Sequence, residues 1–307
     1  MLIALRWVIL MSFRGGFMLI YMNGKLVKKE DACVSVFDHG LLYGDGVFEG
    51  IRSYDGLVFK LAEHIDRLYA SAHGISLTIP IDKKEMEKAI VDTLKANKLK
   101  DAYIRAVVTR GEGDLGLDPR NCAKATVFII TGKIALYPAE MYKKGLKIVT
   151  VPTRRNSPEA LNPQIKSLNY LNNILGKIEA INAGVAEAIM LDQNGFVTEC
   201  TGDNIFMIKG QNLMTPPVSV GVLNGITRQG VISIASKAGL AFQERMITRF
   251  ELFTADEMFL TGTAAEIIPV VMMDARSIGS GRPGEYTLAL IREFKKLTRK
   301  EGVRYAV

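Results

Sequence analysis

The chain has 307 residues, more than one hydrophobic core usually holds, and its 48% hydrophobic and 23% charged residues are typical of a folded protein with two domains. The net charge of +7 is spread along the sequence without a recognition motif, so we expect no nucleic-acid partner. Three cysteines without CxxC spacing favour a reducing cytoplasm over a disulfide framework, and three histidines without HExxH spacing argue against a metal site.

Residues 1–18 form an apolar stretch without acidic residues, which raises the question of a signal peptide or a membrane anchor. Arg6 interrupts the apolar run, and no small-residue cleavage site follows it. The stretch is also too short to span a bilayer. We therefore interpret residues 1–18 as an N-terminal extension, expect the working protein to begin near Met18 or Met22, and predict no membrane attachment.

Residues 19–131 are predicted to form a small α/β domain. The turn signal at Asn23-Gly24 indicates a hairpin, and apolar residues at helical spacing or in short runs indicate helices and buried strands. In chain order, the expected elements are a hairpin at 19–23 and 25–27, helices at 63–74 and 83–97, and strands at 102–109 and 125–130. Residues 132–144 follow as a connector, with Pro138 as a breaker.

Residues 145–307 are predicted to form a larger α+β domain. Its turn signal at Asn194-Gly195 lies between two of the expected strands. In chain order, the expected elements are a strand at 146–151, a helix at 168–183, strands at 186–191, 196–199 and 204–209, a helix at 227–239 with Thr227 as its N-cap residue, a strand at 257–260 and a helix at 285–300.

One literal motif match is interpreted as coincidence. Residues 111–116 read GEGDLG and fit the GxGxxG fingerprint of dinucleotide-binding proteins. That fingerprint must open a helix, but Leu117-Asp118-Pro119 follows here and favours a turn. We therefore predict a flexible loop here. A nucleotide-binding module is a weak alternative, because only this match and the positive charge support it.

Seven separated segments carry a stronger signal. They are DHGLLYGDGVFEGIR (38–52), EHIDRL (63–68), AYIR (102–105), IKSLNY (165–170), TE (198–199), LNGITR (223–228) and TGTAAE (261–266). Their order and spacing resemble the fold-type IV pyridoxal-phosphate enzymes, most closely the branched-chain amino acid aminotransferases. The resemblance covers about residues 20–300 and implies a two-domain α+β fold with pyridoxal 5'-phosphate bound at the interface of the domains.

The resemblance also implies which residues hold the cofactor. An aldehyde cofactor needs a lysine amine, which can later move the Cα proton of the substrate, and the IKSLNY segment identifies Lys166 as that catalytic lysine. Tyr170 is expected to bond the phenolic oxygen, and Glu199 to keep the pyridine nitrogen protonated. The phosphate is expected to lie at a helix N-terminus beside an arginine. Its predicted ligands are Arg67, Ile226 and Thr227, and Thr263 is expected to be a further cofactor-binding residue.

The substrate residues follow from the same resemblance. The turn at Thr263 and Ala264, with Tyr103, is expected to hold the α-carboxylate, and Arg105 to pair with the distal carboxylate of glutamate. Phe48 and Tyr43 are expected to form an apolar wall. Tyr43 and the loop near Leu117 would come from a partner subunit, which implies a homodimer or a higher homo-oligomer.

We therefore expect ping-pong transamination of L-leucine, L-isoleucine and L-valine with 2-oxoglutarate. Relatives often carry a tryptophan in the connector, but the only tryptophan here is Trp7, so a roomier pocket and a broadened range of side chains are expected. A D-amino acid aminotransferase remains an alternative because EHIDRLYASA and IKSLN resemble that family too. Aminodeoxychorismate lyase, which shares the lysine and the fold, is a second alternative.

Overall fold

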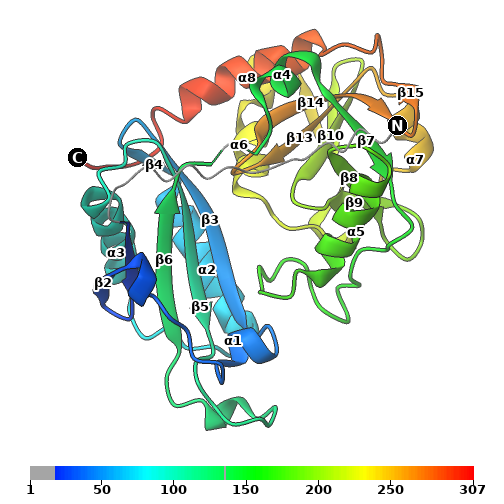
Figure 1. The fold of residues 1–307 in the computed structure, drawn as a ribbon. Coiled ribbons are helices and arrows are strands. Elements are labelled where there is room, and N and C mark those ends of the chain that lie inside the picture. Colours follow the sequence, from blue (N-terminus) through cyan, green and yellow to red (C-terminus); the bar gives the residue numbers. More distant parts are fainter. Residues whose placement is uncertain (1–17, 135) are drawn as a thin grey trace, which may run out of the picture.

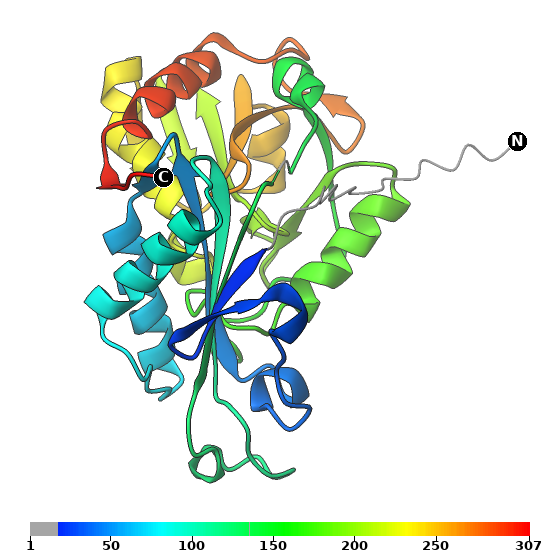
Figure 2. The same cartoon turned by 60° about the vertical axis from the view of Figure 1, so that its left-hand side comes forward.

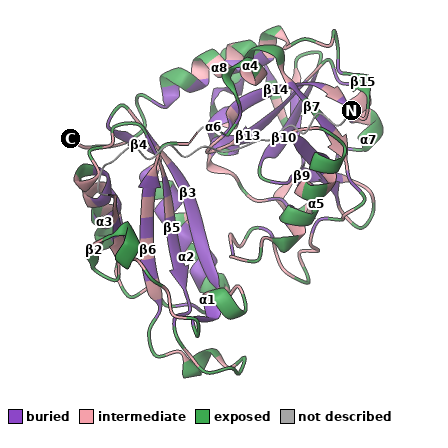
Figure 3. Cartoon of the chain, in the orientation of Figure 1, coloured by how far each residue is buried: buried purple, intermediate pink, exposed green. Residues whose placement is uncertain are grey.

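The computed structural model describes residues 18–134 and 136–307, which are arranged around two β-sheets (Figure 1). The predicted N-terminal extension therefore lies outside the described residues, except for Met18. In both sheets the strands are largely buried, and exposed residues gather on the helices and loops (Figure 3). The mixture of helices with two sheets confirms the predicted α+β fold class.

The first sheet has seven strands, and each pairs with its neighbours in antiparallel fashion. In spatial order the strands are β16 (Gly302–Arg304), β4 (Leu57–Phe59), β3 (Gly46–Tyr54), β5 (Ala102–Thr109), β6 (Thr126–Gly132), β1 (Leu19–Met22) and β2 (Lys25–Lys28). Helices α2 (Leu61–Gly74) and α3 (Lys83–Ala96) pack together on this sheet through a shared apolar core (Figure 2). Three short helices complete this half: η1 (Lys29–Asp31), α1 (His39–Leu42) and η2 (Pro119–Asn121).

Helix α3 illustrates why the periodic helices were predictable. Its buried residues include Met86, Ile90 and Leu94, one stripe at a spacing of four residues, which packs into the core of the first sheet. Asp82 and Glu85 form a reciprocal capping box that satisfies backbone N–H groups at its start. Sequence pattern and local chemistry therefore agree on where this helix begins.

The second sheet has nine strands and mixes parallel with antiparallel pairs. In spatial order its strands are β12 (Ala241–Glu244), β11 (Asn212–Thr215), β10 (Asn204–Lys209), β13 (Glu257–Gly262), β14 (Glu266–Met273), β7 (Leu146–Thr150), β8 (Glu187–Leu191) and β9 (Val197–Cys200), with β15 (Arg276–Ser277) beside β14. The helices of this half are α4 (Ala139–Lys144), α5 (Leu171–Asn182), η3 (Val218–Val220), α6 (Ile226–Ile234), η4 (Ala235–Ala238), α7 (Arg249–Phe253) and α8 (Glu285–Leu297). Two apolar clusters share the strands of this sheet, one including Ile148 and Leu260 and the other including Phe206 and Phe259.

The structure corrects several predicted elements. The helix expected at 168–183 begins only at Leu171, because the backbone before it pairs with β3: Leu168 N donates to Gly46 O over 2.9 Å. The connector expected at 132–144 ends in helix α4, which begins directly after its N-cap residue Pro138. The helix expected at 227–239 starts one residue earlier, with Gly225 rather than Thr227 as N-cap, and continues after Ile234 as η4.

Strand β16 links the end of the chain to the first sheet. It pairs with β4, with Val303 opposite Val58, although residues 145–307 were predicted as one domain. The predicted boundaries at 131 and 145 remain a prediction. Residues 302–304 nevertheless form hydrogen bonds as an edge strand of the sheet in the N-terminal half.

Candidate active site

Lys166 lies in a loop that is fixed to the first sheet and to helix α2. Its carbonyl accepts from Phe48 N over 3.0 Å, and its own N–H donates to Ser71 Oγ over 3.1 Å. The side-chain Nζ lies 2.9 Å from the Tyr170 hydroxyl and 4.6 Å from the centroid of the Phe48 ring. The amine is thus held at a defined place, next to a phenol and an aromatic face.

Glu199 lies on β9 in the other half of the molecule and is 5% exposed. Oε1 accepts from Arg155 Nε over 3.0 Å and from Arg155 Nη2 over 2.8 Å. Oε2 accepts from Asn204 Nδ2 and from Leu223 N, each over 3.1 Å. Four donors from three segments therefore orient this carboxylate.

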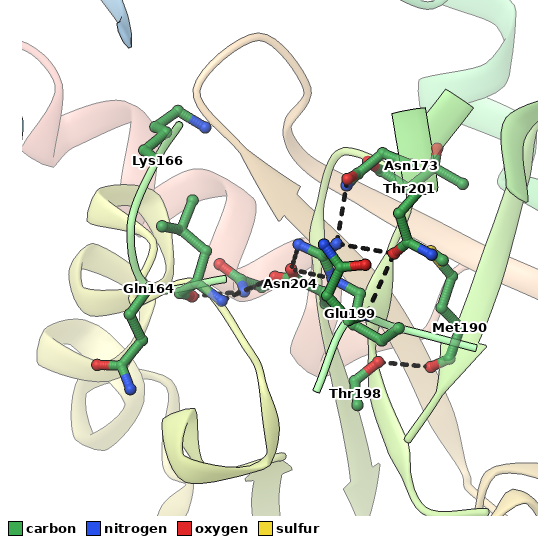
Figure 4. Close-up of polar contacts among 12 residues, drawn as sticks. Gln164, Lys166, Asn173, Met190, Thr198, Glu199, Thr201 and Asn204 are labelled. Atoms are coloured by element: carbon green, nitrogen blue, oxygen red, sulfur yellow. Dashed lines mark hydrogen bonds and ion pairs between the residues drawn. The ribbon is translucent and has the colours of Figure 1, made fainter. Parts of the chain in front are cut away.

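One pocket joins these two predicted residues. Lys166, Tyr170 and Glu199 all line it, together with Arg155 and Leu223. In Figure 4, Lys166 and Glu199 come from facing elements, and the lysine amine points toward the side on which Glu199 lies. The amine and the carboxylate, which are distant in the sequence, are therefore on walls of the same pocket.

Arg67 reaches from α2 toward the N-terminus of α6. Its Nε and Nη2 donate to Glu49 over 2.6 and 2.9 Å, and Nη1 donates to the carbonyl of Asn224 over 2.8 Å. Burial opposes a charge on the fully buried Glu49, but Arg67 and then His64 more than offset it and lower the pKa of that carboxyl to about 2. His64 Nδ1 lies 2.7 Å from Glu49 and must be the donor, because a charged carboxylate only accepts. Glu49 and His64, which anchor Arg67, were not predicted.

The N-terminus of α6 has no side-chain cap. Gly225 occupies the N-cap position, and a Cβ added there would clash with Asn204 Oδ1, so the backbone requires glycine. Backbone N–H groups at the start of a helix are a ready anion site. Ile226 and the buried Thr227 supply the first of these groups, next to the loop that Arg67 contacts.

The turn at Thr263 and Ala264 connects β13 to β14. Arg52 on β3 donates to the Ala264 carbonyl over 3.1 Å and pairs with Glu266 over 3.1 Å. Glu266 adopts a left-handed backbone with φ of 58°, which is uncommon for a residue with a side chain. A cation from the first sheet thus holds a tight turn of the second, a contact that was not predicted.

Phe48, Tyr103 and Arg105 lie together on the adjacent strands β3 and β5. The Arg105 guanidinium lies 4.4 Å from the centroid of the Phe48 ring, and Arg105 Nη2 donates to the Tyr103 hydroxyl over 3.0 Å. The Phe48 ring also meets the Tyr170 ring edge to face, with centroids 5.0 Å apart. Phe48 therefore contacts both Lys166 and Tyr170, while Arg105 lies against the Phe48 ring and Tyr103 contacts Arg105.

Tyr43 is placed apart from that group. It follows α1, is exposed, and its hydroxyl donates to the carbonyl of Leu115 over 2.6 Å. His39 binds the same loop, with Nε2 lying 2.8 Å from the Asp114 carbonyl oxygen. Hydrogen bonds from Tyr43 and His39 therefore hold the loop at 111–121 against α1.

A buried acidic pair supports the wall of the pocket. Glu187 Oε1 accepts from Thr201 N over 3.0 Å, and Asp203 lies so near Gly262 that a Cβ there would clash with its Oδ1. The Tyr137 hydroxyl, which has one proton to donate, lies within hydrogen-bond distance of both carboxyl groups, 3.3 Å from Asp203 and 3.4 Å from Glu187. Burial first, and then the charge of Glu187, raise the pKa of Asp203 from 3.8 to about 7.

This raised pKa predicts how stability depends on pH. The folded protein binds the proton of Asp203 more tightly than the unfolded chain does, so this proton stabilises the fold below about pH 4 and its contribution is lost as the pH rises through about 7. We expect urea unfolding at a series of pH values to show the free energy of unfolding falling across this window. Asp203→Asn should flatten the decline, whereas the exposed control Asp66→Asn should leave it unchanged. An equal decline in both variants would assign the dependence to other groups.

Comparisons with known proteins agree on one family. The family model described as amino-transferase class IV matches residues 46–272. A protein of Methanocaldococcus jannaschii, provisionally named a branched-chain-amino-acid aminotransferase, is 54% identical over 287 residues, covering 94% of this chain and 99% of that protein.

Two solved structures are similar throughout. The branched-chain amino acid aminotransferase of Escherichia coli superposes with a TM-score of 0.90 at 36% identity, covering 92% of this chain and 95% of that one. The T.th. branched-chain amino acid aminotransferase, complexed with N-(5'-phosphopyridoxyl)-L-glutamate, gives a TM-score of 0.87 at 36% identity, with coverages of 94% and 96%.

Proposed function

This chain belongs to the class IV aminotransferases and, among them, to the branched-chain amino acid aminotransferases, and we propose that it moves the amino group of L-leucine, L-isoleucine or L-valine to 2-oxoglutarate with pyridoxal 5'-phosphate as its cofactor. The observation that carries the proposal is the pocket lined by both Lys166 and Glu199. The comparisons do not favour a D-amino acid aminotransferase or a lyase.

The chemistry of the donor set fits this cofactor. When bound, pyridoxal phosphate supplies an aldehyde that takes up amines and a ring that withdraws electrons from the Cα of the amino acid. The described residues offer a matching group for each of its parts. Lys166 offers an amine, Tyr170 a phenol for the ring oxygen and Glu199 a carboxylate for the ring nitrogen. Arg67 and the N–H groups of Ile226 and Thr227 would hold the phosphate, with Thr263 as a further cofactor-binding residue.

Lys166 is the proposed proton carrier. With the cofactor and an amino acid bound, the free Nζ would accept the Cα proton of the amino acid and would then deliver a proton to the cofactor carbon that takes up the amino group. The Tyr170 hydroxyl, 2.9 Å away, orients the amine during this exchange. Glu199 would accept a hydrogen bond from the ring nitrogen and would balance its positive charge.

The substrate is proposed to lie against the first sheet. The turn at Thr263 and Ala264 and the Tyr103 hydroxyl hold the α-carboxylate, while Phe48 offers an apolar face to an aliphatic side chain. Because Arg105 lies on the Phe48 ring at 4.4 Å, a cation is available at the edge of that apolar surface. One pocket can then accept leucine against the ring and the distal carboxylate of glutamate against the guanidinium.

We also propose that the enzyme is a homo-oligomer in which Tyr43 and the loop near Leu117 complete the site of a partner subunit. Leu115 and Leu117 are 70% and 78% exposed, an unusual state for apolar side chains at a loop tip. Helix α5 buries small or polar residues, Asn173, Gly176 and Ala180, and exposes its aliphatic ones. The exposed set is Leu171, Ile174, Leu175, Ile178 and Ile181.

Leu117→Asp tests this assembly. The added charge should prevent burial of the loop against a partner subunit, so we expect the mass in analytical ultracentrifugation to fall toward that of the monomer and activity to fall on dilution. Leu26→Asp changes an exposed leucine on β2 and should leave both unchanged. A wild-type protein that sediments as a monomer with full activity would contradict the proposal.

The described part of the chain contains no helix long and apolar enough to cross a membrane. A cytoplasmic location is part of the proposal, supported by three cysteines, Cys33, Cys122 and Cys200, that are all free thiols.

A half-reaction panel tests the proposed function. The cofactor-loaded enzyme is mixed with one amino acid at a time, without an oxo acid, and the change in cofactor absorbance is followed. L-Leucine, L-isoleucine, L-valine and L-glutamate should each convert the cofactor to its aminated form, and D-alanine and D-glutamate should not. L-Phenylalanine tests whether the range of accepted side chains extends to aromatic ones. Conversion by D-amino acids alone would replace the proposal with the D-selective alternative.

A further inference from the structure

Arg155 is a buried cation to which no role was assigned from the sequence. It is 6% exposed and follows β7, outside any helix or strand. Its Nε and Nη2 both donate to one oxygen of Glu199, and its Nη1 donates to the side-chain oxygens of Asn172 and Asn173 over 3.2 and 3.1 Å. Every nitrogen of the guanidinium therefore has a partner.

The two asparagines fix the direction of this guanidinium. Asn172 Nδ2 donates to the Arg154 carbonyl, and Asn173 Nδ2 donates to the Thr201 carbonyl, each over 2.8 Å. Since both amide nitrogens are committed, both amide oxygens must face Arg155. In Figure 4, Asn173 and Thr201 lie close to each other beside the group around Glu199. The arrangement holds a permanent positive charge against Glu199, because arginine does not give up its proton in proteins.

A buried carboxylate needs such a partner. Taking a charge out of water is costly, and a carboxyl group without a counter-charge takes up a proton instead. A protonated Glu199 would donate a hydrogen bond rather than receive one, and it would carry no charge to balance a protonated ring nitrogen. Before the cofactor enters the pocket, Arg155 is the cation that forms an ion pair with Glu199 among the described residues.

We propose that Arg155 is a positioning residue for Glu199: it keeps this carboxylate negative and turned into the pocket before the cofactor arrives. The inference rests on the proposed function, in which Glu199 meets the ring nitrogen. Asn204 extends the same network, because its Nδ2 donates both to Glu199 Oε2 and to the Leu223 carbonyl, in the loop that leads to α6. Asn204 thereby connects Glu199, which is proposed to contact the ring nitrogen, to the loop before the proposed phosphate site.

The test uses infrared spectra of the whole apoenzyme, because a carboxylic acid and a carboxylate absorb differently. In the difference between Arg155→Gln and Arg155→Gln/Glu199→Gln, we expect the C=O band of a protonated carboxylic acid. In the difference between wild type and Glu199→Gln, we expect carboxylate bands for Glu199 and no C=O band of a carboxylic acid. Arg155→Lys, which restores the charge, should remove the acid band again, and the exposed neighbour Arg154→Gln should not produce it. Carboxylate bands for Glu199 in Arg155→Gln would overturn the proposal.

Folding of the variants provides a second readout. Breaking a buried ion pair destabilises more than removing both charges. If Arg155→Gln fails to fold, the double variant Arg155→Gln/Glu199→Gln should recover the folded state. A double variant that also fails would mean that Arg155 only ties its segment to α5, and the proposal would be wrong. A wrong assignment of the cofactor site would give a different result. The wild-type protein would then bind no pyridoxal phosphate, although the apoenzyme spectra would still show the expected bands.

Discussion

Replacing Lys166 with alanine is expected to reduce transamination by roughly 10³-fold or more, because the substitution removes both the amine that holds the cofactor and the base that moves the Cα proton. The methyl side chain that remains cannot reach the Tyr170 hydroxyl, which lies 2.9 Å from Nζ in the intact protein. The visible absorbance of the cofactor joined to the protein should disappear with the activity. The measurement is kcat with L-leucine and 2-oxoglutarate, alongside the absorbance spectrum.

A matched control separates this loss from a general effect on folding. Lys144→Ala removes an exposed lysine that pairs with Glu140 on α4, and it should keep both the spectrum and the rate. Added methylamine, a small amine able to enter the pocket, should restore part of the activity of Lys166→Ala. A Lys166→Ala enzyme that keeps both its absorbance and its turnover would refute the assigned role.

Arg105→Ala is expected to lower kcat/KM for glutamate and 2-oxoglutarate by roughly 10- to 100-fold, the range expected when a charged hydrogen-bond donor is lost. Leucine should be affected only a few-fold, because its side chain needs the apolar face of Phe48 and not the cation beside it. The two half-reactions are measured separately, so that each substrate reports on its own contact.

Loss of the Tyr103 contact complicates this comparison, since Arg105 Nη2 also donates to the Tyr103 hydroxyl. Arg105→Lys is therefore measured in parallel: it keeps the charge and should retain part of the activity with glutamate while the bidentate geometry is lost. Equal losses for leucine and glutamate in Arg105→Ala would reject a role in recognising the distal carboxylate.

The elements that the sequence predicted well are those with a clear period. Helix α3 shows a stripe of apolar residues every four positions and a capping box, and both signals are local. Strand β3 was not predicted although it carries Phe48, Glu49 and Arg52. It is buried on both faces and includes a charged residue at 0% exposure, so it has no alternation to reveal it.

Strand β14 was missed for a different reason. Pro269 lies inside it, and proline argues against a central strand because it cannot donate to a neighbour. In the structure, pairing of β14 with β7 begins only at Val270, so Pro269 lies beside β13 but before β7. At this position Pro269 avoids the conflict that a proline causes in a strand paired on both sides.

Among the site residues, those with a known motif were named from the sequence, whereas the residues that hold them were not. Arg155 contacts Glu199 across 44 positions, and Arg52 contacts Ala264 across 212. No local pattern connects such pairs, because only the folded topology brings β3 to the turn between β13 and β14. Glu49 and His64 stood inside the motif segments at 38–52 and 63–68, but nothing in those segments indicated that both would be buried around Arg67.

The central claim is that Lys166 holds pyridoxal phosphate in the pocket that Glu199 also lines. Reduction of the cofactor-loaded enzyme with sodium borohydride joins the cofactor permanently to the amine that holds it, and mass spectrometry of the digested protein then locates that amine. We predict that the added mass lies on Lys166 and is absent from Lys166→Ala. Attachment to another lysine, or no attachment in a protein that is active with the cofactor, would contradict the account.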